Sequence, residues 1–156
     1  MVDRTNLGKF SPSANNIYQE LRGALGVGIW SMPAIGGDSL FYGPVGSPIL
    51  EFRFQNARLL NVPVTQTSVT FPYPGATPSI STNEGRNAIV WATANTNPAV
   101  LYAFNGNTLH MLYNSNQAPN NRDHFGNGNK YITPMIANGK VYAASQTGVG
   151  VFGLLR

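Results

Sequence analysis

The chain has 156 residues, which is long enough for one domain with a hydrophobic core. Charged residues are scarce at 10%, compared with roughly 25% in an average globular domain, so asparagine must supply much of the polar surface. The sequence contains 17 glycines and 11 prolines, and these residue types favour turns. The composition therefore argues against a helical bundle and predicts many short elements.

The net charge of +4 arises from ten scattered cations and six acids, with no basic run. Because nucleic-acid binders gather their cations into a patch, we expect no nucleic-acid partner. The absence of cysteine excludes disulfides and thiolate metal sites. No apolar run approaches the ~20 residues of a membrane helix, so no membrane partner is expected. Residues 1–10 also lack the apolar segment of a signal peptide.

Residues 1–25 are expected to form an N-terminal loop with at most one short helix. Ser13 could cap such a helix and Gly23 could end it. Ile17, Leu21 and Leu25 have helical spacing between these two residues.

Three copies of a Pro-x-Ile motif organise the rest of the chain. Their prolines, Pro33, Pro78 and Pro134, are 45 and 56 residues apart, which is close to the ~40–50-residue period of a β-propeller blade. A polar turn and a second apolar strand follow each motif. These second strands are expected at residues 40–42, 89–92 and 141–144.

Each unit continues with further strands. Third strands are expected at residues 49–54, 100–104 and 149–152, and fourth strands at residues 58–60 and 109–113. In the first of the third strands, Glu51 and Arg53 alternate with apolar residues, a period of two that is typical of a half-buried strand. Glu51 is therefore expected at the surface.

The strands predict an all-β chain of about three four-stranded β-propeller blades. The blades would span residues 26–62, 63–117 and 118–156, and the last would lack its outer strand.

Several of these segments are shared with a known family. The most specific one is residues 132–142, ITPMIANGKVY, supported by residues 77–81, 89–92, 101–104 and 113–117. They resemble the C-terminal blades of bacterial quinoprotein-like (PQQ-repeat, alcohol-dehydrogenase-like) propeller proteins. The resemblance implies relatives with about seven or eight blades, often secreted or periplasmic. PQQ or calcium would be possible only through this resemblance. No cofactor is expected, because the chain lacks the adjacent cysteine pair of the catalytic members and no Glu/Asn/Asp set aligns to their calcium-and-quinone site.

An arc of three blades leaves two blade faces open, lined by residues such as Phe41, Trp91 and Tyr142. Blades bury their faces against neighbours, and exposed apolar patches mark interaction sites. The missing outer strand adds an unpaired sheet edge. We therefore predict a homodimer in which two chains close a six-bladed ring with twofold symmetry.

Candidate catalytic residues are few. No two of the six acids form a motif for general acid–base chemistry, and the only histidines are His110 and His124. Because zinc sites use several protein ligands, no metal site is expected. We therefore predict no catalytic residues.

A ligand site in the loops is possible. Arg4 and Arg122 begin similar segments, so we expect them at matching places in successive repeats. Asp123 and His124 follow Arg122, and Trp30, ahead of the first repeat, could stack on a sugar.

Three functions remain open from the sequence. The leading interpretation is a non-catalytic, self-assembling β-propeller fragment that acts as a structural or binding scaffold. The second is a propeller that binds a glycan or a protein through its Asn-rich loops. The third is a remnant of a PQQ-dependent quinoprotein dehydrogenase.

Overall fold

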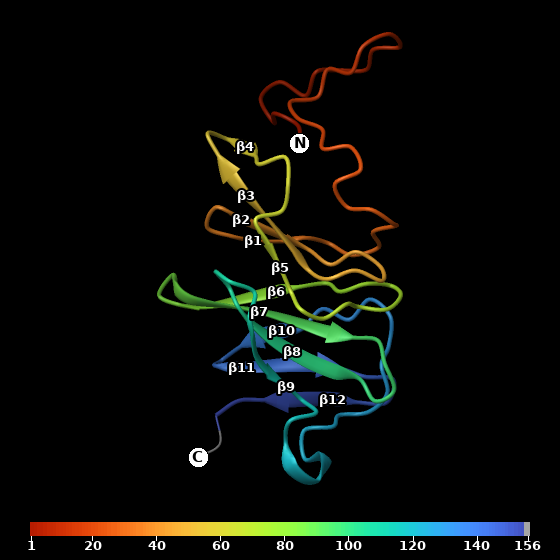
Figure 1. Cartoon of the computed structure of the whole chain (residues 1–156), viewed down its shortest axis with the longest axis vertical. Helices are drawn as coiled ribbons and strands as arrows, with labels where there is room; N and C mark the ends of the chain where they lie inside the picture. Colours follow the sequence, from red (N-terminus) through yellow and green to blue (C-terminus); the bar gives the residue numbers. More distant parts are fainter. Residues whose placement is uncertain (155–156) are drawn as a thin grey trace.

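The computed structural model describes residues 1–154 and is all-β (Figure 1). These residues form three antiparallel sheets and no α-helix, with a short 3₁₀ turn at Pro119–Asn121. Within the same range, no helix is long and apolar enough to span a membrane. The prediction of an all-β chain is confirmed.

The first sheet contains β1 (Ala34–Gly36), β2 (Ser39–Tyr42), β3 (Leu50–Gln55), β4 (Arg58–Leu59) and β5 (Thr65–Gln66). Strands β1 to β4 lie in sequence order, and β5 also pairs with β3. Because β4 pairs with the end of β3 and β5 with its beginning, these two short strands share the outer position of a four-stranded unit. The sequence pattern did not predict β5.

The other two sheets follow in chain order. The second contains β6 (Ser79–Asn83), β7 (Arg86–Ala94), β8 (Val100–Asn105) and β9 (Met111–Asn114), and the third contains β10 (Met135–Ala137), β11 (Lys140–Ala144) and β12 (Val149–Phe152). Neighbours in sequence are neighbours in each sheet. In the described part of the chain the third sheet has no fourth strand, as the sequence predicted.

Two-residue turns join the first two strands of each sheet. They are Gly37-Asp38, Glu84-Gly85 and Asn138-Gly139. In the second and third turns both residues have positive φ, as a type I′ hairpin requires. These turns hold each Pro-x-Ile strand beside the apolar strand that follows it.

The three sheets repeat the same apolar pairing. The isoleucine of each motif lies opposite an apolar residue of the second strand, which lies opposite a phenylalanine of the third strand. These rows are Ile35–Leu40–Phe52, Ile80–Val90–Phe104 and Ile136–Val141–Phe152. Phe104 packs toward the first sheet and Phe152 toward the second, so each of these phenylalanines faces the preceding sheet.

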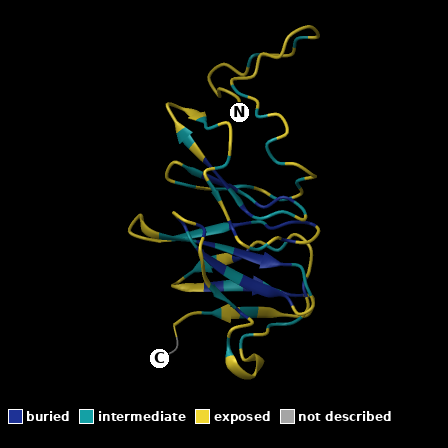
Figure 2. Ribbon diagram, viewed as in Figure 1, coloured by how far each residue is buried: buried dark blue, intermediate teal, exposed yellow. Residues whose placement is uncertain are grey.

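Two hydrophobic cores hold the sheets together. The larger lies between the first and second sheets and includes Phe41, Phe71 and Phe104, each at most 1% exposed. Phe71 comes from the connection between β5 and β6 and packs edge-to-face on Phe104, with ring centroids 6.5 Å apart. Figure 2 shows the buried residues concentrated in and around the second sheet. The second sheet is therefore the central layer.

The smaller core joins the second and third sheets. Leu101, Val141 and Ala143 form it, and Trp91 and Phe125 pack against it. Phe125 comes from the connection before β10, as Phe71 comes from the connection before β6. Each connection thus inserts one phenylalanine between two sheets. Strand contacts between sheets concentrate on the first strands, with β6 touching β1 on one side and β10 on the other.

The prediction that Phe41 and Trp91 line open faces is wrong. Phe41 points into the core between the first two sheets, and Trp91 packs against the core between the second and third. Both residues face the next sheet in the chain, which covers them. Of the three aromatic residues named for the open faces, Tyr142 alone has no following sheet in the described residues to cover it.

The surface position predicted for Glu51 is also wrong, because its side chain is fully buried. Glu51 lies opposite Phe41 in the ladder, so it faces the second sheet. Ser39 donates a hydrogen bond to Glu51 Oε1 over 2.6 Å, and the Arg53 guanidinium lies 2.8 Å from the same oxygen. Glu51 Oε2 has no hydrogen-bond partner among residues 1–154. The alternating pattern identified the strand correctly, but another sheet covers the face that the pattern assigned to solvent.

Residues 13–23 contain no helix, an outcome that the prediction of a loop with at most one short helix allowed. The N-terminal segment, residues 1–25, extends beyond the first sheet at the top of Figure 1. Its apolar residues Ile17, Leu21 and Leu25 instead border a cavity against the first sheet. Their helical spacing did not produce a helix, because so short a segment gains more from contact with a sheet than from its own turns.

Candidate functional site

The five residues predicted for a loop site lie in three separate places. Arg4 is exposed in the N-terminal segment, and Trp30 precedes β1. Arg122, Asp123 and His124 lie in the connection between β9 and β10, at the opposite end of the molecule from Arg4 (Figure 1). The similar segments at Arg4 and Arg122 have different surroundings, because Leu7, which aligns with Phe125, is 64% exposed whereas Phe125 packs against the second core.

Arg122 and Asp123 form a polar cluster with Tyr113. The Arg122 guanidinium donates two hydrogen bonds to the Asp123 carboxylate, over 2.7 and 2.9 Å. The Tyr113 hydroxyl, at the end of the second sheet, donates to Asp123 Oδ2. The cluster therefore ties the long connection to β9.

These hydrogen bonds shift the titration of both acidic groups. The bonds from Arg122, followed by the bond from Tyr113, lower the pKa of Asp123 to about 2. Burial, followed by the bond to Asp123, raises the pKa of Tyr113. The cluster has no free base or nucleophile, so it is suited to fixing the connection and not to catalysis.

We expect acid to loosen this connection. Since the folded-state pKa of Asp123 lies below its ordinary value of 3.8, its stabilising contribution is complete above that ordinary value and is lost as the pH falls from about 4 to about 2. The protection of amides 120–125 against hydrogen exchange, relative to an unstructured peptide at the same pH, should therefore fall across this window. The Asp123→Asn variant should lack this fall, whereas unchanged protection in the natural chain would contradict the assignment.

His124 follows the cluster, but it completes no metal site. Among residues 1–154, no group of three or more His, Cys, Asp or Glu side chains could hold a metal ion. The structure therefore places no metal ligand set around the predicted loop residues.

A second cluster gathers exposed aromatic rings around Trp30. Trp30 and Tyr73 are in edge contact, with centroids 6.3 Å apart and an interplanar angle of 70°. The hydroxyls of Tyr73 and Tyr131 are 3.1 Å apart, and Lys130 Nζ lies 5.2 Å from the Tyr73 ring centroid. The exposed fractions are 59% for Trp30, 44% for Tyr73 and 57% for Tyr131. We call these four residues the aromatic ridge.

The aromatic ridge follows from the repeat. Trp30 and Tyr131 each stand three residues before the proline of a Pro-x-Ile motif, and Tyr73 stands five residues before the middle one. Every sheet therefore contributes one ring where the chain enters its first strand. Sequence analysis identified Trp30 but missed the two tyrosines. An aromatic residue a few positions before each proline was the available signal.

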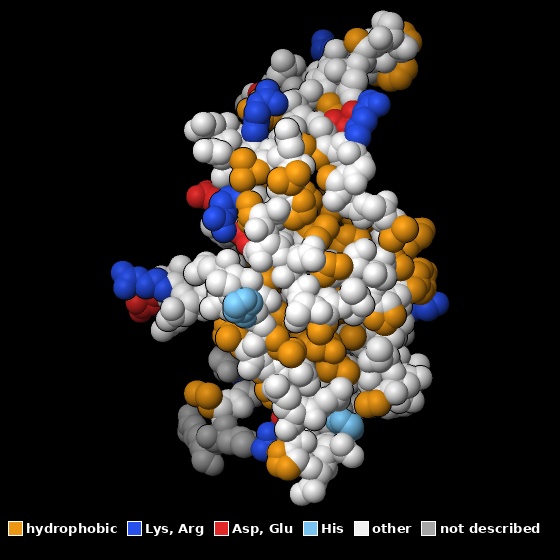
Figure 3. Space-filling model, in the orientation of Figure 1, with side chains coloured by type: hydrophobic (Ala, Val, Ile, Leu, Met, Phe, Trp, Pro, Cys, Tyr) orange, Lys and Arg blue, Asp and Glu red, His pale blue; other side chains and the backbone are white. Residues whose placement is uncertain are grey.

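Charged side chains are sparse on the face of the molecule drawn in Figure 3. On the face drawn in Figure 3, hydrophobic side chains spread over the sheets and along the edge that carries the connections between them, while Lys and Arg side chains are scattered. Large exposed apolar patches on soluble proteins mark binding surfaces.

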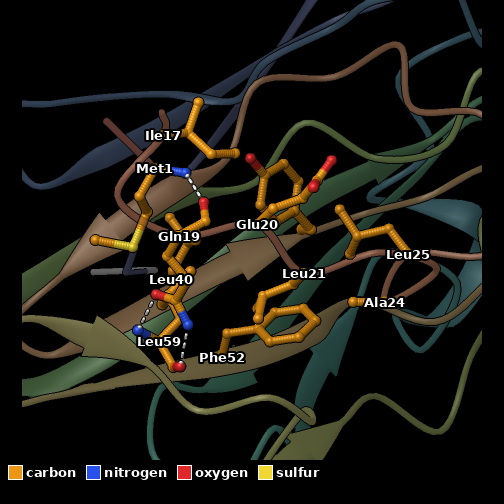
Figure 4. Close-up of a pocket in the computed structure, with 11 residues that line it drawn as sticks. Met1, Ile17, Gln19, Glu20, Leu21, Ala24, Leu25, Leu40, Phe52 and Leu59 are labelled. Atoms are coloured by element: carbon orange, nitrogen blue, oxygen red, sulfur yellow. Dashed lines mark hydrogen bonds between the residues drawn. The ribbon is translucent and has the colours of Figure 1, made fainter. Parts of the chain in front are cut away.

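A cavity of about 370 Å³ separates the N-terminal segment from the first sheet. Figure 4 shows Leu21 and Leu25 on one side and Leu40 and Phe52 on the other. The Gln19 side chain anchors the segment, because its amide donates to the Leu59 carbonyl over 2.8 Å and accepts from the Leu59 amide over 2.9 Å. The segment therefore covers the outer face of the first sheet without filling the space beneath it.

The opposite end of the stack has an uncovered apolar face, which we call the open face. Tyr142 lies opposite Met135 and Val151, so the three side chains share one side of the third sheet, and Val149 lies on the same side. The exposed fractions are 57% for Met135, 61% for Val149 and 56% for Val151. No element of the described chain covers this face, and exposed and intermediate residues alternate along β12 (Figure 2).

Corresponding positions in the second sheet are buried. In the strand pairing, Val149 and Val151 of the third sheet correspond to Leu101 and Ala103 of the second sheet. Leu101 is 0% exposed and Ala103 is 2% exposed. The third sheet covers them. The open face therefore has the position and the chemistry of a sheet-to-sheet interface.

Comparison of the chain with protein-family models, curated proteins and solved structures found no match. The resemblance to quinoprotein-like propellers stays a prediction, as do PQQ and calcium as its cofactors.

Proposed function

We propose that the chain is a non-catalytic, self-assembling scaffold built from three β-propeller blades. Two copies would close a six-bladed ring with twofold symmetry, in which the third sheet of each copy packs on the first sheet of the other. The observation that carries the proposal is the open face, whose counterpart in the second sheet is buried by the following sheet.

The arrangement of the sheets supports the assignment to blades. The three first strands touch one another along the chain order, as the innermost strands of adjacent blades do. Val90 and Val141 face the preceding sheet, and Phe41 and Trp91 face the following one. In a closed ring, every sheet would have a neighbouring sheet on both of its faces.

The N-terminal segment would compete with ring closure. Leu40 and Phe52 are only 7% and 2% exposed, although no sheet precedes them in the chain, because residues 1–25 occupy that side. A second copy can reach them only if this segment moves away. Gln19 anchors the segment to Leu59 by two hydrogen bonds, and Arg58 donates one to the Tyr18 carbonyl and lies over the Tyr18 ring. The cavity and the small number of these contacts favour such a movement.

Weakening the anchor should therefore favour the dimer. The Gln19→Ala substitution removes two hydrogen bonds to Leu59, each contributing about 1 kcal/mol. Because the ring displaces the segment of both copies, about 4 kcal/mol of anchoring is lost and dimerisation should tighten by more than about a hundredfold. Sedimentation velocity over a concentration series measures this effect. Asn15→Ala is the matched control, because the Asn15 amide bonds to Glu20 inside the segment. Unchanged or weaker dimerisation of Gln19→Ala would refute the competition.

Light scattering after size exclusion tests the proposed function itself. A discrete species of about twice 16.8 kDa supports the two-copy ring. A larger discrete oligomer retains self-assembly but rejects this ring. A folded monomer at every concentration rejects self-assembly and leaves the open face for a different partner.

A further inference from the structure

We propose that the aromatic ridge binds a neutral pyranose oligosaccharide. This inference does not depend on self-assembly, because Trp30, Tyr73, Lys130 and Tyr131 all belong to one chain and none of them is a residue of the open face.

The rings offer the apolar part of such a site. Trp30 and Tyr131 are more than half exposed, so their faces are accessible without rearrangement of the core. The axial and equatorial C–H groups of a pyranose form a flat apolar surface that stacks on an aromatic face. Three rings contributed by three successive sheets suit a ligand with several sugar units.

The hydroxyls offer the polar part. Tyr73 and Tyr131 share one hydrogen bond of 3.1 Å, so the pair retains one free donor and several lone pairs. Neighbouring sugar hydroxyls have a similar separation and carry both donors and acceptors, which matches this pair. The Lys130 ammonium beside the Tyr73 ring adds further donors.

A proline-rich peptide is the main competing ligand, because such segments also dock on exposed aromatic residues. Proline has no backbone N–H, so a polyproline segment provides carbonyl acceptors only. It would leave the lone pairs of the exposed tyrosine pair to water, whereas sugar hydroxyls can also donate to them. The hydroxyl pair therefore favours the sugar.

The test titrates the full chain with soluble hexasaccharides of glucose, mannose, galactose and N-acetylglucosamine, and separately with decaproline. Trp30 is one of only two tryptophans, and the other, Trp91, packs between sheets, so tryptophan emission reports on the ridge. We expect at least one hexasaccharide to shift the emission with a Kd below about 1 mM.

Variants then locate the site. Trp30→Ala should weaken binding about tenfold or more, and Tyr131→Phe should weaken it while keeping the ring; for both, isothermal titration calorimetry replaces emission as the readout. Phe10→Ala, which removes an exposed ring elsewhere, should bind as the natural chain does. Binding of no hexasaccharide, binding unaffected by both ridge variants, or binding of decaproline alone would each overturn the proposal.

Discussion

The Phe104→Ala variant should lose about 3–5 kcal/mol of unfolding free energy, the range found when a buried phenylalanine is cut back to alanine. Phe104 is fully buried and contacts two other aromatic residues. Its Tyr102 neighbour is stacked at a centroid distance of 5.8 Å, and Phe71 packs on its edge. Removing the ring opens a cavity in the layer that joins the first two sheets.

The loss would be a large share of the total stability, since native domains are stable by only about 5–15 kcal/mol. Urea unfolding followed by far-UV circular dichroism at one fixed chain concentration measures it. Phe10→Ala removes the same side chain from a position that is 92% exposed, so it should change stability by no more than about 0.5 kcal/mol. An equally small effect at Phe104 would mean that the first two sheets do not share this core.

The Val151→Lys variant should remain monomeric at concentrations where the natural chain dimerises. In the proposed ring, Val151 is buried against the first sheet of the second copy, and an ammonium placed there has no facing acid. Desolvating an unpaired charge costs several kcal/mol. Twofold symmetry places this cost in both interfaces, so dimerisation should weaken by more than about a hundredfold.

The monomer should tolerate the same change, because Val151 is 56% exposed in one chain. Leu112→Lys is the matched control, since Leu112 is 53% exposed and lies on β9 of the second sheet, which forms neither of the two faces that the ring would bury. Light scattering should show a dimer for this control and a monomer for Val151→Lys. A dimer formed by both variants would show that copies associate through another surface.

If the ring forms, the chain has two alternative occupants for the outer face of its first sheet. Within one copy, residues 17–25 cover Leu40 and Phe52 and leave a cavity. In the ring, the third sheet of a second copy would cover them. Assembly would then depend on how firmly Gln19 holds Leu59, which links the behaviour of the N-terminal segment to the oligomeric state.

Local patterns identified the strands. The Pro-x-Ile motifs, the turns such as Asn138-Gly139 and the apolar runs after them are short-range signals, and β1, β6 and β10 all form where the motifs occur. Turn chemistry also sets the pairing within each hairpin. For these reasons the all-β class, the three sheets and the missing fourth strand of the third sheet could be read without coordinates.

Contacts between segments that are far apart in the chain could not be predicted from the sequence. Glu51 has the pattern of a surface residue but is buried, because the second sheet covers it. Tyr73 and Tyr131 are 58 residues apart, and only the adjacency of two sheets brings their hydroxyls together. The spacing of Ile17 and Leu21 is compatible with a short helix, but these side chains border the cavity against the first sheet.

The sequence by itself determined the repeat, the strand class and the identity of the residues that line each face, because these depend on neighbours within a few positions along the chain. The tertiary structure decided which faces are covered, which end of the stack is open and which side chains form the aromatic ridge. Those outcomes depend on the order in which sheets stack, and no local pattern encodes that order.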